Sequence, residues 1–187
     1  MFVVYAAEEL NGAVNKDDVV YLTDDAKTSV KDGYIVDLYF MKDLSLSEDV
    51  TIDDAGQTTQ GFYVFTVDGE VYKLKADSSN ELRDEVTDNS DGYGTGIVFD
   101  SVKNTNVSSH DDQFVGVSFK DATVIDTRSS SEKKADIYSN DIESTSRLTS
   151  AIEKGEVTAD VYVEDGEIIF VAVTACENAA ETPEKPD

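Results

Sequence analysis

The stretch Glu156-Val-Thr-Ala-Asp-Val-Tyr-Val-Glu-Asp165-Gly166-Glu-Ile-Ile-Phe-Val-Ala-Val-Thr-Ala175 decides the fold class. Two runs rich in valine, isoleucine and aromatic residues flank an Asp-Gly pair. Both central residues of a type I′ turn need a positive φ, which aspartate tolerates and glycine adopts freely. The stretch therefore predicts a β-hairpin with a two-residue turn at Asp165-Gly166.

A second stretch repeats this pattern. Gly61-Phe-Tyr-Val-Phe-Thr-Val-Asp68-Gly69-Glu-Val-Tyr-Lys-Leu-Lys75 predicts a hairpin with the same turn at Asp68-Gly69. Two such hairpins in 187 residues favour two small modules over one large domain. The expected division is a first β module at 1–79, an acidic Gly/Ser/Asn linker at 80–95, a second β module at 96–176 and a Pro/Glu tail at 177–187.

The remaining apolar runs predict the other elements of each module. In the first module we expect strands at 2–9, 19–22 and 34–41, while 44–55 fits either a short helix or a strand. In the second module, strand patterns occupy 96–102, 114–119 and 122–126, and a short one is possible at 135–138. A single helical turn is possible at 81–86, and 128–134 reads as polar and exposed.

One helix is predicted in the second module, near 141–154. Leu148, Ala151 and Ile152 share one helical face there. Asp141 and Ser144 are both suitable N-caps, and Gly155 is placed for the C′ position.

This order of elements predicts a mainly β protein of two tandem small β-barrel modules. Five strands with a helix before the fourth is the order of an OB-like barrel, and a β-sandwich is the alternative. Two alignments of the copies compete, since either Val3–Tyr5 or Val19–Tyr21 can match Ile97–Phe99. Both alignments end each module with the same hairpin.

Charge excludes several classes of partner. The chain has 40 acidic and 15 basic residues, a net charge of −25 and a pI near 4.1. Such a field repels nucleic acid and anionic lipid. No apolar run reaches the roughly 18 residues that a membrane-spanning helix requires. We therefore expect neither nucleic-acid binding nor direct insertion into a membrane, and we interpret most carboxylates as solvated.

The inventory of catalytic residues is poor. The one histidine, His110, lies in Ser108-Ser-His-Asp-Asp112, and residues adjacent in sequence cannot adopt the geometry of a catalytic triad. The one cysteine, Cys176, ends the last predicted strand and is interpreted as a small apolar filler. Paired acids could serve a glycosidase, but 40 acids make pairs unavoidable and tryptophan is absent. We therefore predict that the protein is not an enzyme.

Calcium is the one cofactor that the acidic loops suggest. Calcium prefers carboxylate and carbonyl oxygens around a bend of the chain. Thr87 stands where an EF-hand loop would begin with aspartate, so the pattern is incomplete. The candidate calcium ligands are Asp88, Asn89, Asp91, Asp111 and Asp112.

Short sequence features of the chain resemble those of a known class of repetitive segments in bacterial proteins. Asp-Gly-Glu hairpins at 68–70 and 165–167, a Val-Tyr-Val strand at 161–163 and a Pro-Glu-Lys-Pro tail at 183–186 carry the likeness. They resemble the repetitive β regions that accompany S-layer-homology or wall-anchor domains in Gram-positive bacteria. The resemblance implies a spacer or lattice role in which strand edges and loops contact neighbours, and it transfers no functional residue.

The predicted function is thus a non-catalytic structural or adhesive segment of a bacterial cell-surface protein. Its expected partners are other cell-surface or cell-wall components, or neighbouring modules of the same protein. Residues 1–7 lack a basic signal-peptide start, so the chain is expected to be a fragment of a longer exported protein. The alternative is an extracellular module that binds a glycan or calcium, with candidate aromatic residues Tyr63, Tyr72, Tyr138 and Tyr162.

Overall fold

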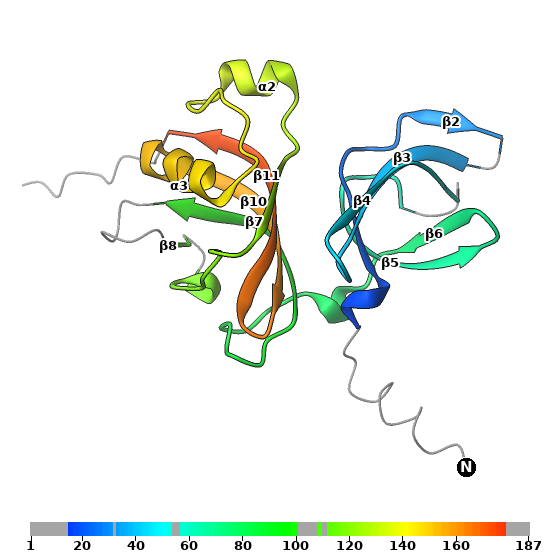
Figure 1. Ribbon diagram of the computed structural model, residues 1–187, viewed down its shortest axis with the longest axis horizontal. Helices are drawn as coiled ribbons and strands as arrows, with labels where there is room; N and C mark the ends of the chain where they lie inside the picture. The colour runs from blue at the N-terminus through cyan, green and yellow to red at the C-terminus, as the bar shows by residue number, and fades with distance from the viewer. Residues whose placement is uncertain (1–14, 32, 54–56, 101–107, 110–111, 179–187) are drawn as a thin grey trace, which may run out of the picture.

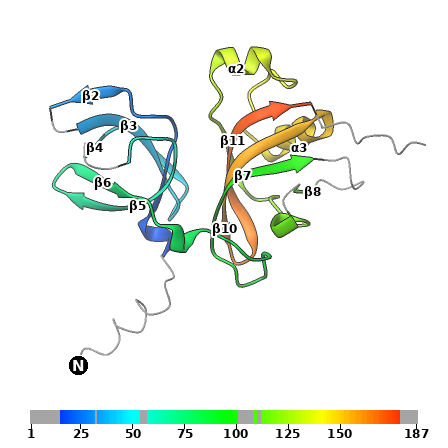
Figure 2. The same cartoon turned by 180° about the vertical axis from the view of Figure 1, so that it is seen from behind.

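The protein is mainly β and is built on two sheets that lie side by side (Figures 1 and 2). A computed structural model describes residues 15–31, 33–53, 57–100, 108–109 and 112–178. The predicted strand at 2–9 lies outside these residues. No helix in the described ranges is long and apolar enough to span a membrane.

The first sheet has six strands. They are β1 (Val19–Leu22), β2 (Thr28–Val30), β3 (Gly33–Phe40), β4 (Ser45–Ile52), β5 (Gly61–Asp68) and β6 (Val71–Lys75), preceded by a 3-10 turn, η1 (Lys16–Asp18). The order is β1-β5-β6-β4-β3-β2, and β1 also pairs with β3. The pairings of five strands therefore form a closed circuit, with β2 outside it. The strands predicted at 19–22 and 34–41 are confirmed, and the ambiguous segment 44–55 contains strand β4.

The second sheet has five strands in the order β8-β7-β10-β11-β9. They are β7 (Gly92–Asp100), β8 (Ser108–Ser109), β9 (Thr123–Asp126), β10 (Glu156–Glu164) and β11 (Glu167–Glu177). All pairings in this sheet are antiparallel except that of β9 with β11. Strand β7 begins at Gly92, inside the segment expected to be linker. The strand predicted at 122–126 is confirmed as β9.

The strand predicted at 114–119 is wrong. A 3-10 turn, η3 (Asp112–Phe114), is followed by Gly116 at φ 76°, and Val117 N–H donates to Phe114 O (3.1 Å). This turn interrupts the extended backbone and leaves Phe114 as a buried anchor, 1% exposed. The possible strand at 135–138 and the helical turn at 81–86 are also wrong. Residue 135 ends a helix, and the turn lies earlier, at η2 (Ser78–Asn80).

Two helices precede β10. Helix α3 (Thr145–Lys154) confirms the predicted helix, with Ser144 as its N-cap. Helix α2 (Ser130–Ala135) was not predicted as a helix, although its capping box of Ser129 and Glu132 is complete.

Gly155 follows α3 with an extended φ of −179°, so no left-handed C-cap forms. A Cβ at Gly155 would lie 2.3 Å from Glu177 O. Glycine is required there by the close approach of β11 and not by a left-handed conformation.

The two Asp-Gly pairs form different turns. Asp165 (φ 50°) and Gly166 (φ 76°) form the predicted turn with two positive φ angles. In the first hairpin, Asp68 pairs with Val71, which leaves Gly69-Glu70 as the two-residue loop. Only Gly69 has a positive φ there (64°), as a type II′ turn requires. The predicted turn at Asp68-Gly69 is therefore wrong by one residue.

Three hydrophobic clusters hold the layers together. The first lies within the first sheet and the second lies between α3 and the second sheet. The third joins the two sheets and contains Val19, Tyr21, Met41, Phe62, Tyr162, Phe170 and Ala172. Successive residues of a strand point to opposite faces, so β1 sends Val20 and Leu22 into the first cluster and Tyr21 into the third. The second sheet is thus covered by α3 on one face and by the first sheet on the other.

Candidate functional site

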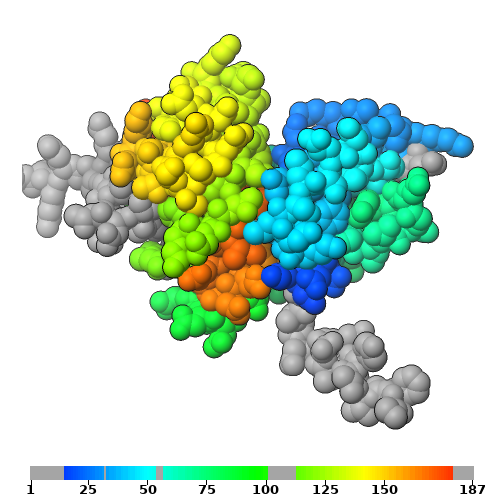
Figure 3. Space-filling model, in the orientation of Figure 1, coloured from blue at the N-terminus to red at the C-terminus, as the bar shows by residue number. Residues whose placement is uncertain are grey.

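A groove lies where the two sheets meet beside β9. Its volume is about 890 Å³. One wall comes from the first sheet, the other comes from the segment that enters α3, and β9 with its flanking residues lies between them. Figure 3 shows these parts of the chain adjoining on one face of the molecule, with the residues before and in β9 between the first sheet and the α3 segment. The lining residues are Thr23, Asp37, Tyr39, Leu46, Lys120–Thr127 and Glu143–Thr145.

Strand β9 presents an open edge to this groove. It is the last strand of its sheet, and in the described part of the chain only β11 pairs with it. Thr127 N–H donates to Val173 O (3.0 Å), so the backbone groups of Thr127 and, by alternation, of Ile125 face β11. Those of Val124 and Asp126 face the groove. Hydroxyl and carboxylate groups surround this edge, so the groove can accept hydrogen bonds and attract cations.

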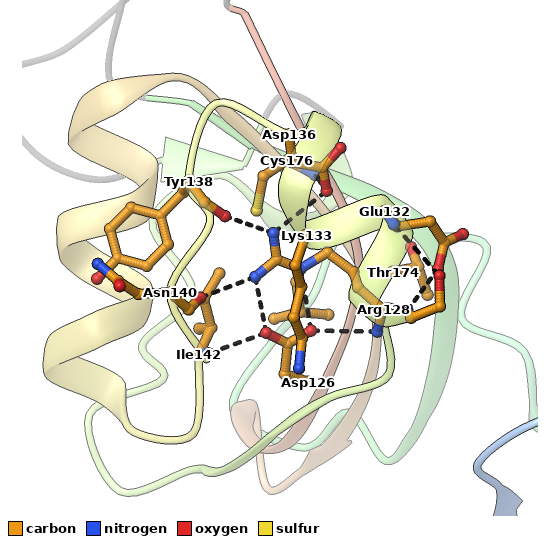
Figure 4. Close-up of polar contacts among 12 residues, drawn as sticks. Asp126, Arg128, Glu132, Lys133, Asp136, Tyr138, Asn140, Ile142, Thr174 and Cys176 are labelled. Atoms are coloured by element: carbon orange, nitrogen blue, oxygen red, sulfur yellow. Dashed lines mark hydrogen bonds and ion pairs between the residues drawn. The ribbon is translucent and has the colours of Figure 1, made fainter.

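A buried ion pair joins Asp126, which lines the groove at the end of β9, to Arg128 (Figure 4). The side chains of Arg128 and Asp126 are both fully buried. The Arg128 guanidinium donates from Nε (3.0 Å) and Nη2 (2.7 Å) to Asp126, and from Nη1 to Asp136 (3.2 Å). Its two other N–H groups donate to the backbone oxygens of Tyr138 (2.5 Å) and Asn140 (3.0 Å). All five guanidinium donors are therefore used within the protein.

The acceptors of Arg128 are held by further bonds. Asp126 Oδ2 also accepts from Ile142 N–H (2.9 Å), and Asp136 Oδ2 accepts from Cys176 N–H (3.2 Å). Burial lowers the pKa of Arg128, but the hydrogen bonds that it donates to the Asp126 and Asp136 carboxylates more than offset this effect, so the net pKa is raised. Burial raises the pKa of the Cys176 thiol to about 11, which makes this thiol a poor nucleophile. This cluster joins β9, α2, the loop before α3 and β11, and leaves no donor for a ligand.

A second polar group, the half-buried Asp160, lies at the contact between the sheets. Tyr21 Oη on β1 donates to Asp160 Oδ2 on β10 (2.7 Å), and Gly96 N–H donates to Asp160 Oδ1 (3.0 Å). Burial raises the pKa of Asp160, and the two hydrogen bonds partly oppose this rise. Burial and the neighbouring carboxylate also raise the pKa of Tyr21. The phenol is thus a hydrogen-bond donor at neutral pH, and its bond to Asp160 holds the two sheets together at this point.

Two more polar contacts cross the same junction. Gln60 Nε2 donates to Tyr21 Oη (2.9 Å) and to Thr127 Oγ1 (2.8 Å), which connects the first sheet to the residue after β9. Lys16 Nζ forms an ion pair with Glu164 (2.7 Å) at the other end of β10. These contacts therefore hold the first sheet against the second sheet and the residue that follows β9.

The predicted calcium candidates do not gather around one point in the described ranges. Asp91 Oδ1 accepts from Asp165 N–H (2.8 Å), so this carboxylate caps the second hairpin turn. Asp88 and Asn89 lie in the tight turn beside it. Asp112 begins η3, and Asp111 and His110 lie outside the described residues. No group of three or more histidine, cysteine, aspartate or glutamate side chains that could hold a metal ion occurs among the residues described.

The four tyrosines considered for glycan binding are in or beside the hydrophobic clusters. Tyr63 and Tyr138 are each 7% exposed and Tyr162 is 1% exposed, while Tyr72 packs at the margin of the first cluster. In this arrangement the three buried rings cannot form an exposed stacking platform. Cys176 is buried in the second cluster, in keeping with its interpretation as a core residue.

Sequence reasoning did not single out Arg128, Asp126 or Asp160. Two of the three carried a usable signal, because Asp160 interrupts a valine-rich strand and Asp126 ends an apolar one. A charge at such a position needs a buried partner. The partner itself is set by tertiary contacts.

No protein-family model matches the chain, and searches of curated proteins and of solved structures found no significant match.

Proposed function

We propose that this chain is a non-catalytic structural and protein-interaction segment of a bacterial cell-surface protein. In this proposal the first unit is a small OB-like barrel module and the second is an open sheet covered by α3, and the two are docked as one body that spaces or connects neighbouring components. The closed circuit of pairings in the first sheet supports the barrel interpretation for that unit, whereas β8 and β9 leave the second sheet open.

The observation that carries this proposal is the aromatic cluster between the sheets. Phe62 of the first sheet contacts the rings of Tyr21, Tyr93, Tyr162 and Phe170, at centroid distances of 4.7–6.1 Å. Aromatic pairs of this kind stabilise contacts beyond the area that they bury. Two modules joined in this way keep a fixed orientation, which a spacer requires and a flexible tether does not.

Two polar groups at the candidate site and the sheet contact, Arg128 and Asp160, have structural partners. Arg128 uses all its donors on backbone and carboxylate oxygens, and Asp160 is held by Tyr21 and Gly96. A general acid or base must reach a substrate, and both groups are instead engaged in hydrogen bonds within the protein. This arrangement favours a structural role over a hydrolase that uses two acids.

Calorimetry tests the docked-body proposal. We expect one cooperative transition whose midpoint is unchanged by calcium or by EDTA. A rise of several degrees with calcium would favour the rival function in its calcium-binding form. Two separate transitions in the unmodified protein would contradict the proposal of one docked body.

A junction variant sharpens this test. Phe62→Ala removes the ring at the centre of the third cluster, so we expect the transition to split or broaden. Val67→Ala lies on the same strand but is 52% exposed, and serves as the matched control. A split in the control as well would show that the junction is not what couples the sheets.

The surface location needs its own experiment. Antibodies raised against the purified chain should bind intact cells that produce the parent protein, and brief protease treatment of those cells should remove the signal. Binding only after lysis would contradict an extracellular location. An acidic surface is compatible with this location, because its net charge of −25 opposes self-association.

A further inference from the structure

We infer that the groove beside β9 binds an extended basic segment of a partner protein, which adds to the second sheet as a further strand. This inference rests on the proposed interaction function and names the kind of partner. Its first support is the open backbone edge of Val124 and Asp126, which faces the groove. Extended peptides bind such edges by main-chain hydrogen bonds, and their alternate side chains give specificity.

The edge strand of the first sheet, β2, has features that block strand addition. Strand β2 (Thr28–Val30) has three residues, all exposed, and Lys27 and Lys31 flank it. Short edges that carry lysine are poor templates for pairing. Strand β9 instead lies in a hollow of about 890 Å³ with a wall on each side.

The two walls predict the alternation of the partner. Side chains of β9 alternate between the first-sheet side, where Ile125 joins the third cluster, and the α3 side, where Val124 joins the second. An added strand continues this alternation. One set of its side chains meets Tyr39 and the 43% exposed Leu46, and the other set meets the α3 wall at Glu143.

Charge complementarity selects a basic partner. Asp37, Asp121 and Glu143 line the groove with a single lysine, Lys120. Asp126 also lies there, but its charge is matched by the buried Arg128. The net negative lining favours Lys or Arg on the side facing Glu143, and Leu46 with Tyr39 favours an apolar side chain on the other.

Binding of an acetylated peptide with the sequence Lys-Val-Lys-Val-Lys-Val-Lys tests this inference. We expect saturable binding that weakens with added salt, and slower hydrogen exchange at the amides of Val124 and Asp126. Two further peptides carry N-methyl groups, one on its valines and one on its last three lysines. Alternate N–H groups of a strand point to opposite edges, so one of the two peptides should lose binding and the other keep it.

Variants of the two walls provide the matched comparison. Glu143→Gln and Leu46→Ala should each weaken binding of the peptide by about three- to tenfold. Glu153→Gln makes the same glutamate change, and Val67→Ala a comparable apolar truncation, at exposed positions outside the groove, so both should leave binding within about twofold.

The inference is overturned by absence of saturable binding, by equal affinity of the two N-methylated peptides, or by binding without protection of Val124 and Asp126. Those results, combined with a single calcium-independent melting transition, would leave the spacer function standing. Two separate melting transitions with intact peptide binding would contradict the docked-body proposal and leave the peptide-binding inference standing.

Discussion

The first sheet closes its pairings on itself, whereas the second leaves β8 and β9 as open ends and is covered by other elements. The first hairpin turns in open space, since a Cβ at Gly69 would meet nothing within 4 Å. The second hairpin lies at the centre of its sheet, and its turn packs against residues 87–91. The turn of the first hairpin is therefore open, whereas the turn of the second, similar hairpin packs against a neighbouring segment. The difference locates the positions at which substitution will be costly.

The largest expected effect follows from the buried ion pair of the second unit, which has no counterpart among the described residues of the first. Arg128→Met leaves the Asp126 and Asp136 carboxylates without their partner and should lower the free energy of unfolding by about 3–5 kcal/mol. Urea unfolding followed by circular dichroism measures this loss. Arg147→Met, at an exposed arginine on α3, is the control and should change stability by about 0.5 kcal/mol or less. Similar losses in both variants would contradict the proposal that the buried ion pair of Arg128 stabilises this unit.

The two turn glycines give the next effect, and they directly compare the open turn of the first hairpin with the packed turn of the second. Gly166→Ala should cost about 2–4 kcal/mol, because φ is 76° and the new Cβ would lie 2.5 Å from Thr87 O. Gly69→Ala has a similar φ of 64° but open surroundings, so about 1 kcal/mol is expected. Equal costs measured by urea unfolding would mean that the packing around the second turn contributes nothing.

These contrasts also explain how far the sequence predicts the structure. Local patterns were sufficient for both hairpins, for α3 with its Ser144 cap and for the mainly β class, because alternation and capping are short-range signals. The turn at Gly69-Glu70 differs from the turn at Asp165-Gly166 despite the shared Asp-Gly-Glu sequence. That difference depends on register and surroundings, which no window of sequence contains.

The candidate site was predictable only in part, for a related reason. The absence of a tryptophan and the isolation of His110 could be read directly from the sequence. The groove is formed by residues far apart in the chain, such as Leu46 and Glu143, whose proximity depends on how the two sheets dock. The predicted linker at 80–95 suggested separate units, whereas β1 and β11 bury both faces and share a third cluster. Alternation along a strand does not reveal which layer covers its second face.

A smaller effect is expected at the hydrogen bond between the two units. Tyr21→Phe keeps the ring in the third cluster but removes one of the two donors to Asp160, at an expected cost of about 1–3 kcal/mol. Tyr63→Phe, whose hydroxyl donates to Thr59 O within the first unit, is the matched variant. We expect only Tyr21→Phe to make the two units unfold less cooperatively, as seen by comparing calorimetric and van't Hoff enthalpies. Loss of cooperativity in both variants would place the coupling elsewhere.

The smallest effect is a pH dependence that arises at the same junction. Burial raises the pKa of Asp160 above that of an unfolded carboxyl, so the folded state binds this proton more tightly than the unfolded state. The contribution of Asp160 to stability therefore grows as the pH falls from neutral through its folded pKa, and is lost as the pH rises again.

Exposed carboxylates oppose this trend, since hydrogen bonds lower the pKa of Asp43, Asp77 and Glu132. Their stabilising contribution is lost as the pH falls, so the total curve mixes both signs. The Asp160→Asn variant isolates the junction, because it keeps the opposing groups and removes one titration. Relative to the wild type, the variant should be favoured at neutral pH and lose that advantage as the pH approaches 4, near the unfolded pKa of aspartate. A stability difference that is constant over this range would show that Asp160 titrates alike in the folded and unfolded chain, and that the contact between the sheets does not bury its charge.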